Sequence, residues 1–358
     1  LGEGANTHDN TPTLSGVAEA GSTVTILNNG DVLTTLTVPS GGNWSYTPAA
    51  ALSEGSHTLS VSVTDAAGNV STSTSATVIV DTLAPDDLTL TASNNNGSTP
   101  VTIADGGTTN DNTPLLRGVA EAGSVVTIRL DGDVVASLTV GSSGNWSYTS
   151  AALSDGSHTF SVTETDAAGN TGEALSVTLI VDATPPPGAT NLTITNDVTG
   201  VSIPAGGATN DTTPTLSGSA EANATVSVYD GNTLLGTAQV NGSGAWSFVS
   251  PTLGNGAHAL SVAVTDAAGN TGPRTTPVTI TVDTVAPGAA TLVVTNDVSG
   301  SVIPNGGVTS DTTPVLSGRA EAGSIVTVLD GTTLVGSALV GSDGNWTLTP
   351  ATALSETL

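Results

Sequence analysis

Short runs in which apolar or β-branched residues alternate with small polar residues follow one another along the chain. In the third 100-residue stretch the runs predict strands at 191–195, 214–219, 225–229, 234–240, 246–249, 258–265 and 278–282. The segments between them are rich in Gly, Asn and Asp, which are strong turn formers. No segment shows a convincing helical period. Seven short strands are typical of an Ig-like sandwich.

The same pattern recurs at intervals of about 100 residues. Trp44, Trp146, Trp246 and Trp346 open the phrases NWSYT, NWSYT, AWSFV and NWTLT. A unit of this length can close its own core and needs only a linker to its neighbour. We therefore expect an all-β chain of tandem Ig-like antiparallel β-sandwich domains in a linear rod. The expected repeats are 1–84, without its first strand, 85–184, 185–286, and 287–358, without its last strands.

The composition restricts the partners of such a chain. There are 31 acidic residues against four arginines and no lysine, which gives a net charge of −27. This charge disfavours nucleic acids and anionic membranes as partners and favours cations. No cysteine is present, so disulfides and zinc–thiolate sites are excluded, and bound calcium is the expected substitute. No apolar run approaches the roughly 20 residues of a membrane span. The absence of an initiating Met suggests an internal fragment of a longer protein.

Recurring acidic residues are expected to meet where one repeat joins the next. If the strands alternate in direction, the loop with Glu221 and the loop with Asp266 and Asn270 share a pole with Asp182 of the preceding linker. Carboxylate and amide oxygens are calcium ligands, and the carboxylates would repel one another without a cation. The alternative is solvated turn carboxylates and an Asx-turn.

The candidate calcium ligands belong to two groups. Those at the joints, with their equivalents in the first repeat, are Asp81, Glu121, Asp166, Asp182, Glu221, Asp266, Asp283, Glu321, Glu19 and Asp65. Those at the opposite pole form a weaker group, Asp111, Asp211 and Asp311.

Two other recurring residue types favour structural roles. His57, His158 and His258 each stand at the entry to the sixth strand, without convergent partners for zinc binding or catalysis. We expect each to tie a turn to the backbone, as the tyrosine corner does in Ig-like folds. The Trp of each repeat shares a sheet face with the residue two positions later, so we expect it in the core rather than stacked on a sugar.

Three phrases together carry a family resemblance: TPTLSGxAEA, NWSYTP and GSHTLSVxVTDAAGN, followed by VDTxAP. The chain resembles the bacterial Ig-like repeats of giant calcium-dependent surface adhesins and biofilm-associated proteins. The resemblance implies an extracellular, cell-surface extender whose joints are rigidified by calcium. The residues it selects for this role are Asp81, Glu121 and Asp166, then Asp182, Glu221 and Asp266, then Asp283 and Glu321. The fourth repeat lacks the last loop, which leaves its site open. The glycine- and aspartate-rich nonapeptide of calcium-binding β-rolls is absent.

The expected function is therefore mechanical. An extender of a large adhesin would support cell adhesion and biofilm formation, with calcium ions and neighbouring repeats as its partners and glycans or matrix bound by other regions. The alternative is a multivalent carbohydrate- or matrix-binding repeat, in which weak contacts add by avidity. An enzyme is not expected, because a whole active site repeated in every unit is improbable and no Gly-x-Ser-x-Gly elbow is present.

Overall fold

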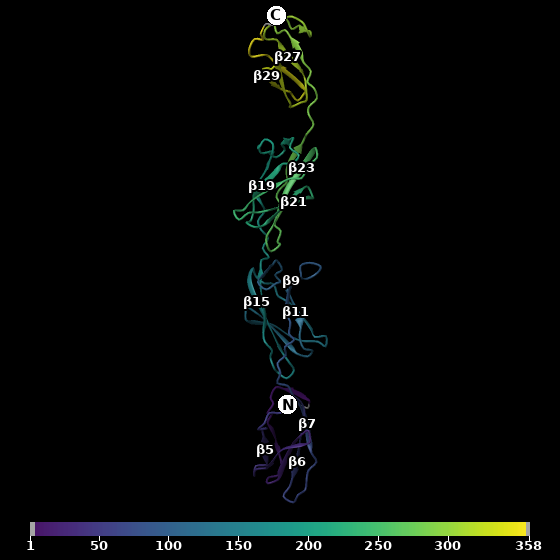
Figure 1. The fold of residues 1–358 in the computed structure, drawn as a ribbon, viewed down its shortest axis with the longest axis vertical. Helices are drawn as coiled ribbons and strands as arrows, with labels where there is room; N and C mark the ends of the chain where they lie inside the picture. The colour runs from purple at the N-terminus through teal and green to yellow at the C-terminus, as the bar shows by residue number, and fades with distance from the viewer. Residues whose placement is uncertain (1–3, 356–358) are drawn as a thin grey trace. The chain divides into compact units, whose positions relative to one another are not determined.

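All regular elements are strands in the computed structural model, which describes residues 4–355 (Figure 1). The ends expected for the first repeat at residue 1 and for the fourth at residue 358 lie outside the described residues. The chain forms two compact units, residues 1–193, 216–248 and 260–277 in one and residues 194–215, 249–259 and 278–358 in the other. The first two repeats lie in the first unit, the fourth lies in the second, and the third contributes to both.

The second repeat contains all the strands of the sandwich within one unit. Its strands are β8 (Thr91–Asn94), β9 (Val101–Ile103), β10 (Gly107–Thr109), β11 (Leu115–Val119), β12 (Val125–Leu130), β13 (Asp133–Thr139), β14 (Asn145–Thr149), β15 (Gly156–Thr165) and β16 (Leu175–Val181). They form one sheet in the order β14-β11-β8-β9 and another in the order β10-β16-β15-β12-β13.

The core of the second repeat lies between these sheets. Alternation along β12 and β16 buries Val126, Ile128 and Leu179 completely, while their neighbours along the strands are more exposed. Trp146 on β14 and Phe160 on β15 join the same cluster, with exposures of 5 % and 0 %. The period of two in the sequence thus becomes one apolar face on each sheet. The expected core position of the Trp is confirmed.

One pairing departs from a wholly antiparallel sandwich. β10 pairs with β16 in parallel, from Gly107 opposite Leu179 to Thr109 opposite Val181. The chain first runs through the other sheet, in which β8 pairs antiparallel with β11, and then crosses to the sheet that contains β10. The opening segment of the repeat is thereby divided between the two sheets, and it borders both.

The first repeat has a related arrangement. Its strands are β1 (Ala5–Thr7), β2 (Leu14–Val17), β3 (Thr23–Asn28), β4 (Asp31–Thr37), β5 (Asn43–Tyr46), β6 (Gly55–Thr64) and β7 (Thr74–Val80). The larger sheet has the order β1-β7-β6-β3-β4, with β1 parallel to β7. Within the described residues, the second sheet of this repeat contains only β2 and β5.

The strands of the third repeat follow the sequence prediction. They are β17 (Thr190–Thr195), β18 (Ala208–Thr209), β19 (Thr215–Ser219), β20 (Thr225–Asp230), β21 (Thr233–Gln239), β22 (Ala245–Val249), β23 (Gly256–Thr265) and β24 (Val278–Val282). Only β18 was not predicted. β20 pairs with β21 and β23 in the first unit, and β18 pairs in parallel with β24 in the second.

The fourth repeat lies wholly in the second unit. Its strands are β25 (Val293–Thr295), β26 (Val302–Ile303), β27 (Val315–Arg319), β28 (Ile325–Asp330), β29 (Thr333–Leu339) and β30 (Asn345–Leu348). One sheet has the order β26-β25-β27-β30 and the other pairs β28 with β29. Leu316, Val340 and Trp346 are its buried core.

Candidate functional site

The loop between β15 and β16 forms a compact turn around Asp166. Its Oδ1 accepts hydrogen bonds from the backbone N–H groups of Ala168, Gly169 and Asn170 at 2.8, 2.7 and 2.9 Å. Its Oδ2 accepts one from Asn170 Nδ2 at 2.7 Å. Burial raises the pKa of Asp166, but these hydrogen bonds outweigh it and leave the pKa below its ordinary value. The Asx-turn considered as the alternative at this position is therefore present.

The same asparagine connects this loop to the linker before the second repeat. Asn170 Nδ2 also donates to the carbonyl oxygen of Asp81 at 2.8 Å. Gly172 lies against the linker as well, because a Cβ placed there would come within 2.5 Å of the Pro85 carbonyl oxygen. The loop with the sequence TDAAGN thus stabilises its own turn and also binds the linker that precedes the repeat.

The second joint repeats this arrangement. Asn270 Nδ2 donates to the carbonyl oxygen of Asp182 at 2.7 Å and to Asp266 Oδ2 at 2.8 Å. Asp266 and Asn270 are both 9 % exposed. The predicted meeting of this loop with the preceding linker therefore occurs at both joints, and it is made by the asparagine amide.

The linkers are also held by the repeat that precedes them. Thr82 N–H donates to Glu54 at 3.0 Å, Ala183 N–H donates to Asp155 at 2.8 Å, and Thr284 N–H donates to Asn255 at 3.1 Å. These acceptors precede the Gly that opens β6, β15 or β23. They were not among the predicted site residues, although their recurrence every 100 residues or so is visible in the sequence. Each of the first two linkers is thus bound by the repeats on both sides.

Negative charge accumulates around Glu121 at the first joint. Although the residue is exposed, loss of hydration is the largest cause that raises the pKa of its carboxyl. The charges of Asp166, Glu164, Asp81 and Asp87 raise it further, in that order. Glu121, Asp166 and Asp81, which the sequence assigned to one site, are therefore near enough to repel one another.

These carboxylates do not surround a single point. Among residues 4–355 no group of three or more His, Asp or Glu side chains is positioned to hold a metal ion. The Asp166 oxygens already accept hydrogen bonds, and Asp81 and Asp182 each accept only one, from Leu83 and Thr184, at 3.2 and 3.3 Å. The donors are of the type that calcium prefers, but side chains have to rotate before they can share an ion.

The other predicted joint residues are more exposed to solvent. Glu19, Glu221 and Glu321 are exposed, and so is Asp283, whose Oδ1 accepts the Val285 N–H at 2.9 Å. Asp65 accepts hydrogen bonds from its own loop, and that of the Asn69 side chain is the main cause that lowers its pKa. A metal role for these residues stays a prediction.

The carboxylates of the opposite pole act as turn caps. Asp111 is completely buried, and its Oδ2 accepts the Asn95 N–H at 2.8 Å while its Oδ1 accepts the Thr113 N–H at 2.9 Å. Asp211 and Asp311 accept equivalent bonds from the backbone N–H groups of Asp197 and Asp297, at 2.7 and 2.9 Å. These bonds join the segment after the first strand of the repeat to the turn that carries the aspartate, and a metal role for these aspartates stays a prediction.

The sequence matches the family described as bacterial Ig-like domain four times. The matched residues are 2–82, 85–183, 187–284 and 287–357. The chain belongs to this family. Its all-β tandem Ig-like architecture, predicted from strand pattern and repeats, is therefore confirmed.

Solved structures similar to this bacterial Ig-like chain resemble it only distantly. Fibronectin(III)-like modules of CbhA from Clostridium thermocellum share 18 % identity, over 51 % of this chain and 90 % of theirs, with a TM-score of 0.30. The BSP domain of a biofilm-associated protein shares 12 % identity, over 80 % of this chain and 62 % of its own, with a TM-score of 0.21. Likeness at this level carries no functional inference. No curated protein matches the sequence.

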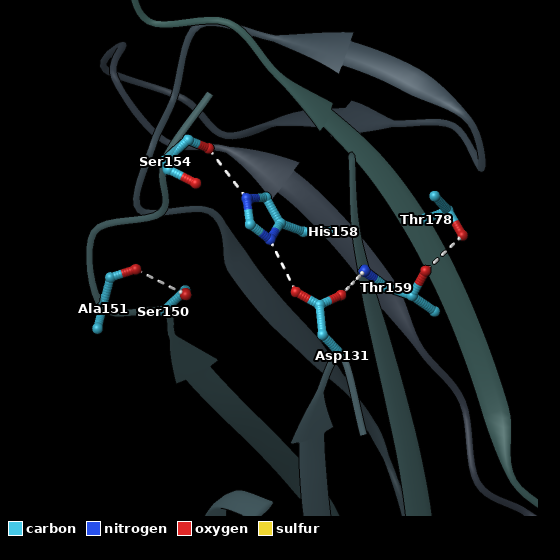
Figure 2. A network of polar contacts seen from close by, with 7 residues as sticks. All are labelled: Asp131, Ser150, Ala151, Ser154, His158, Thr159 and Thr178. Atoms are coloured by element: carbon cyan, nitrogen blue, oxygen red, sulfur yellow. Dashed lines mark hydrogen bonds and ion pairs between the residues drawn. The ribbon is translucent and has the colours of Figure 1, made fainter. Parts of the chain in front are cut away.

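The histidines of the bacterial Ig-like repeats have the expected structural role. Figure 2 shows His158 between two acceptors, with Nε2 at 2.9 Å from the Ser154 carbonyl oxygen and Nδ1 at 2.9 Å from Asp131 Oδ2. The hydrogen bond that His158 donates to Asp131 is the main cause that raises the pKa of His158, and burial opposes it. His57 and His258 contact the equivalent carbonyl oxygens, of Ser53 and Gly254, at 2.7 and 2.8 Å.

Sequence reasoning missed one acidic residue at the first joint. Glu164 on β15 is completely buried, at a position on the core face of the strand. Its Oε1 accepts the Glu121 N–H at 2.6 Å, and its Oε2 has no hydrogen-bond partner. The first and third bacterial Ig-like repeats have Val63 and Val264 at this position. This replacement of valine by an acidic residue is visible in the sequence, and it could have identified Glu164 as an unusual position.

Among residues 4–355 there is no helix with the length and apolar character that a bilayer crossing requires.

Proposed function

We propose that this chain is an extender segment of a bacterial cell-surface adhesin. Tandem Ig-like repeats would hold an adhesive region, located elsewhere in the parent protein, away from the cell, and would thereby support cell adhesion and biofilm formation. The function is mechanical, and it depends on the stiffness of the joints between repeats.

The observation that carries this proposal is the bonding of the linkers. The carbonyl of the first linker residue accepts an asparagine amide from the following repeat, at Asp81 and again at Asp182. The next one or two residues donate to a side chain of the preceding repeat. A freely flexible linker leaves its backbone groups to water, whereas these linkers are bound on both sides. Bound joints are what a spacer needs and what independent binding modules do not.

Calcium is proposed as the second component of the joints. When bound, it would neutralise the acidic side chains of the joint and crosslink the linker to the repeat that follows. Asp81 with Glu121 and Asp182 with Glu221 are the residues proposed to hold it, because their carboxylates accept few or no protein hydrogen bonds. The net charge of −27 supports a requirement for cations.

No observation favours the carbohydrate-binding alternative in this segment. Protein surfaces that bind sugars by stacking present exposed aromatic rings. The four tryptophans are between 4 % and 9 % exposed, and none of the tyrosines or phenylalanines falls in the exposed class. The aromatic residues of this chain are therefore used for its cores.

Charge-removing variants at the second joint test the calcium component. We expect Asp182→Ala and Glu221→Ala to reduce the rise in melting temperature that calcium produces, and to loosen the joint between the second and third repeats while the other repeats stay folded. Asp31→Ala, which removes an exposed carboxylate of the first repeat, is the matched control and should respond to calcium as the parent does. If both joint variants responded to calcium like the control, the proposal would be wrong for this joint. Unfolding of the whole chain would instead assign the residues to internal structure.

A further inference from the structure

The two joints of the first unit differ in their acidic residues. At the first joint Glu164 is buried in the second repeat, where the third repeat has Val264. Asp87 follows Pro85 by two residues, and Gly188 stands in the same relation to Pro186. The two prolines occupy equivalent positions, because Gly172 and Gly272 approach their carbonyl oxygens in the same way, at 2.5 and 2.1 Å for a placed Cβ.

The burial of Glu164 lacks a partner that would compensate it. Oε1 accepts a single hydrogen bond from the Glu121 N–H, and Oε2 accepts none. An ionised carboxylate inside a protein is strongly unfavourable unless it is paired with a cation or with several donors. The charge of Glu164 raises the pKa of the Glu121 carboxyl, as the charges of Asp166, Asp81 and Asp87 also do, so these four acids all act on Glu121. Nothing in this group supplies positive charge.

Glu164 Oε2 is available as a ligand, and several carboxylates act on the neighbouring Glu121 carboxyl. Glu164 is attached through its hydrogen bond to the backbone of Glu121, and its charge acts on the exposed Glu121 carboxyl. A hard divalent cation of the calcium class takes six to eight oxygen ligands in flexible geometry. Glu121 can rotate towards such an ion, because its carboxylate accepts no protein hydrogen bond that would hold it in place.

We propose that Glu164 is a calcium ligand that makes the first joint a tighter cation site than the second. This inference rests on the proposed function and deepens it, because it assigns different affinities to two joints that the repeat sequence makes look alike. The first joint would lose its stiffness last as calcium becomes scarce. Without the ion, Glu164 would be a source of instability that valine is not.

Two substitutions in the full chain separate the charge of Glu164 from its hydrogen bond. Glu164→Val introduces the residue of the sister repeats, and Glu164→Gln retains an oxygen that can accept the Glu121 N–H but removes the charge. Glu173→Gln removes an exposed carboxylate from the same repeat and is the control. Calcium binding is measured by titration calorimetry, and melting is measured in calcium and in chelator.

We expect the parent chain to show one class of sites that binds calcium about tenfold more tightly than the rest, as added ligand charge predicts. Glu164→Val and Glu164→Gln should both lose this class and retain the weaker one, and Glu173→Gln should bind as the parent does. In chelator, Glu164→Val should melt above the parent. In calcium the difference should shrink or reverse.

Other results would overturn the inference in distinguishable ways. If Glu164→Gln bound calcium like the parent, the role of Glu164 would be its hydrogen bond to Glu121. If both variants bound like the parent while chelation still lowered the melting temperature, calcium would act at the joints without Glu164, and the proposed function would stand alone. If the parent bound no calcium, both proposals would fail.

Discussion

Single residues in this chain close turns that have no disulfide to hold them. His158 connects the turn before β15 to the hairpin between β12 and β13, because it contacts Ser154 on one side and Asp131 on the other. Asp131 also accepts the Thr159 N–H at 2.8 Å, and its φ of 51° places it in the left-handed region that Asn and Asp tolerate. The first repeat has Asn29 in the same conformation, with the same bond to Thr58.

Removal of the Asp131 charge should lower the pKa of His158. The folded pKa is raised, so the pair stabilises the fold fully below the unfolded pKa of about 6.5 and loses this contribution as pH rises through the folded value. The pKa of Asp131 is lowered, mainly by the Thr159 N–H and then by His158, so the contribution is also lost as pH falls through that value. An NMR titration of Asp131→Asn should show the His158 pKa shifted downwards. An unchanged pKa would mean that the ion pair is absent in solution.

The glycine opposite each tryptophan is required by close packing. Gly118 pairs with Trp146 across β11 and β14, and a Cβ at Gly118 would come within 1.9 Å of the Thr89 carbonyl oxygen and 2.9 Å of Trp146 Nε1. Gly318 has the same neighbours in the fourth repeat, Thr291 and Trp346. The Gly two residues before Ala-Glu-Ala is therefore a packing requirement of the core.

Gly118→Ala should destabilise the second repeat strongly. The added methyl group has to displace backbone on one side and the indole ring on the other, and overpacking of this kind costs about 1–3 kcal/mol or more. Gly141→Ala is a matched control, because a Cβ there meets nothing within 4 Å, and its effect should stay below about 0.5 kcal/mol. Chemical denaturation of both variants measures the difference. Equal stabilities would show that the strand can move away at little cost.

Among elements, the loop before the last strand binds the preceding linker in the second and third repeats. In the second repeat Asn170 donates to Asp166 within the loop and to Asp81 outside it. In the first repeat Asn69 donates to Asp65 at 2.7 Å. The asparagine of TDAAGN therefore stabilises its own loop in each of these repeats, and in the second repeat it also binds the preceding linker.

Asn170→Ala should loosen the first joint, whereas Asn69→Ala should affect only its own loop. Loss of one hydrogen bond to the linker corresponds to about 1 kcal/mol, or about fivefold faster amide exchange in the linker at Asp81–Leu83. Hydrogen exchange of both variants tests this expectation. Equal exchange of the linker in the two variants would mean that the bond from Asn170 to Asp81 does not hold the joint.

The strands could be predicted well from the sequence, and their pairing less well. Alternation and turn residues located all seven predicted strands of the third repeat, because each strand has one buried face. The parallel pair of β18 with β24 was not predicted, since two residues carry no readable period. Loop positions at the joint were predicted correctly from strand direction. The chemistry of the contact was not, because sequence patterns do not show that Asn170 bonds the linker while Asp166 is occupied within its loop.

At the scale of the whole molecule, the repeats share a design but the joints are not identical. Glu164 and Asp87 make the first joint more acidic than the second, and they interrupt a sequence that is otherwise nearly periodic. Such departures from periodicity are where a repeat protein carries local differences in stability, because each repeat interacts mainly with its neighbours. The net charge of −27 adds repulsion along the chain that bound cations would relieve.

The claim that calcium stiffens the joints is tested most directly by small-angle X-ray scattering of the chain in calcium and in chelator, with melting followed in the same buffers. The account predicts a larger maximum dimension and a higher melting temperature in calcium, and a reduction of both when the ion is removed. A maximum dimension and a melting temperature that do not respond to chelation would contradict it.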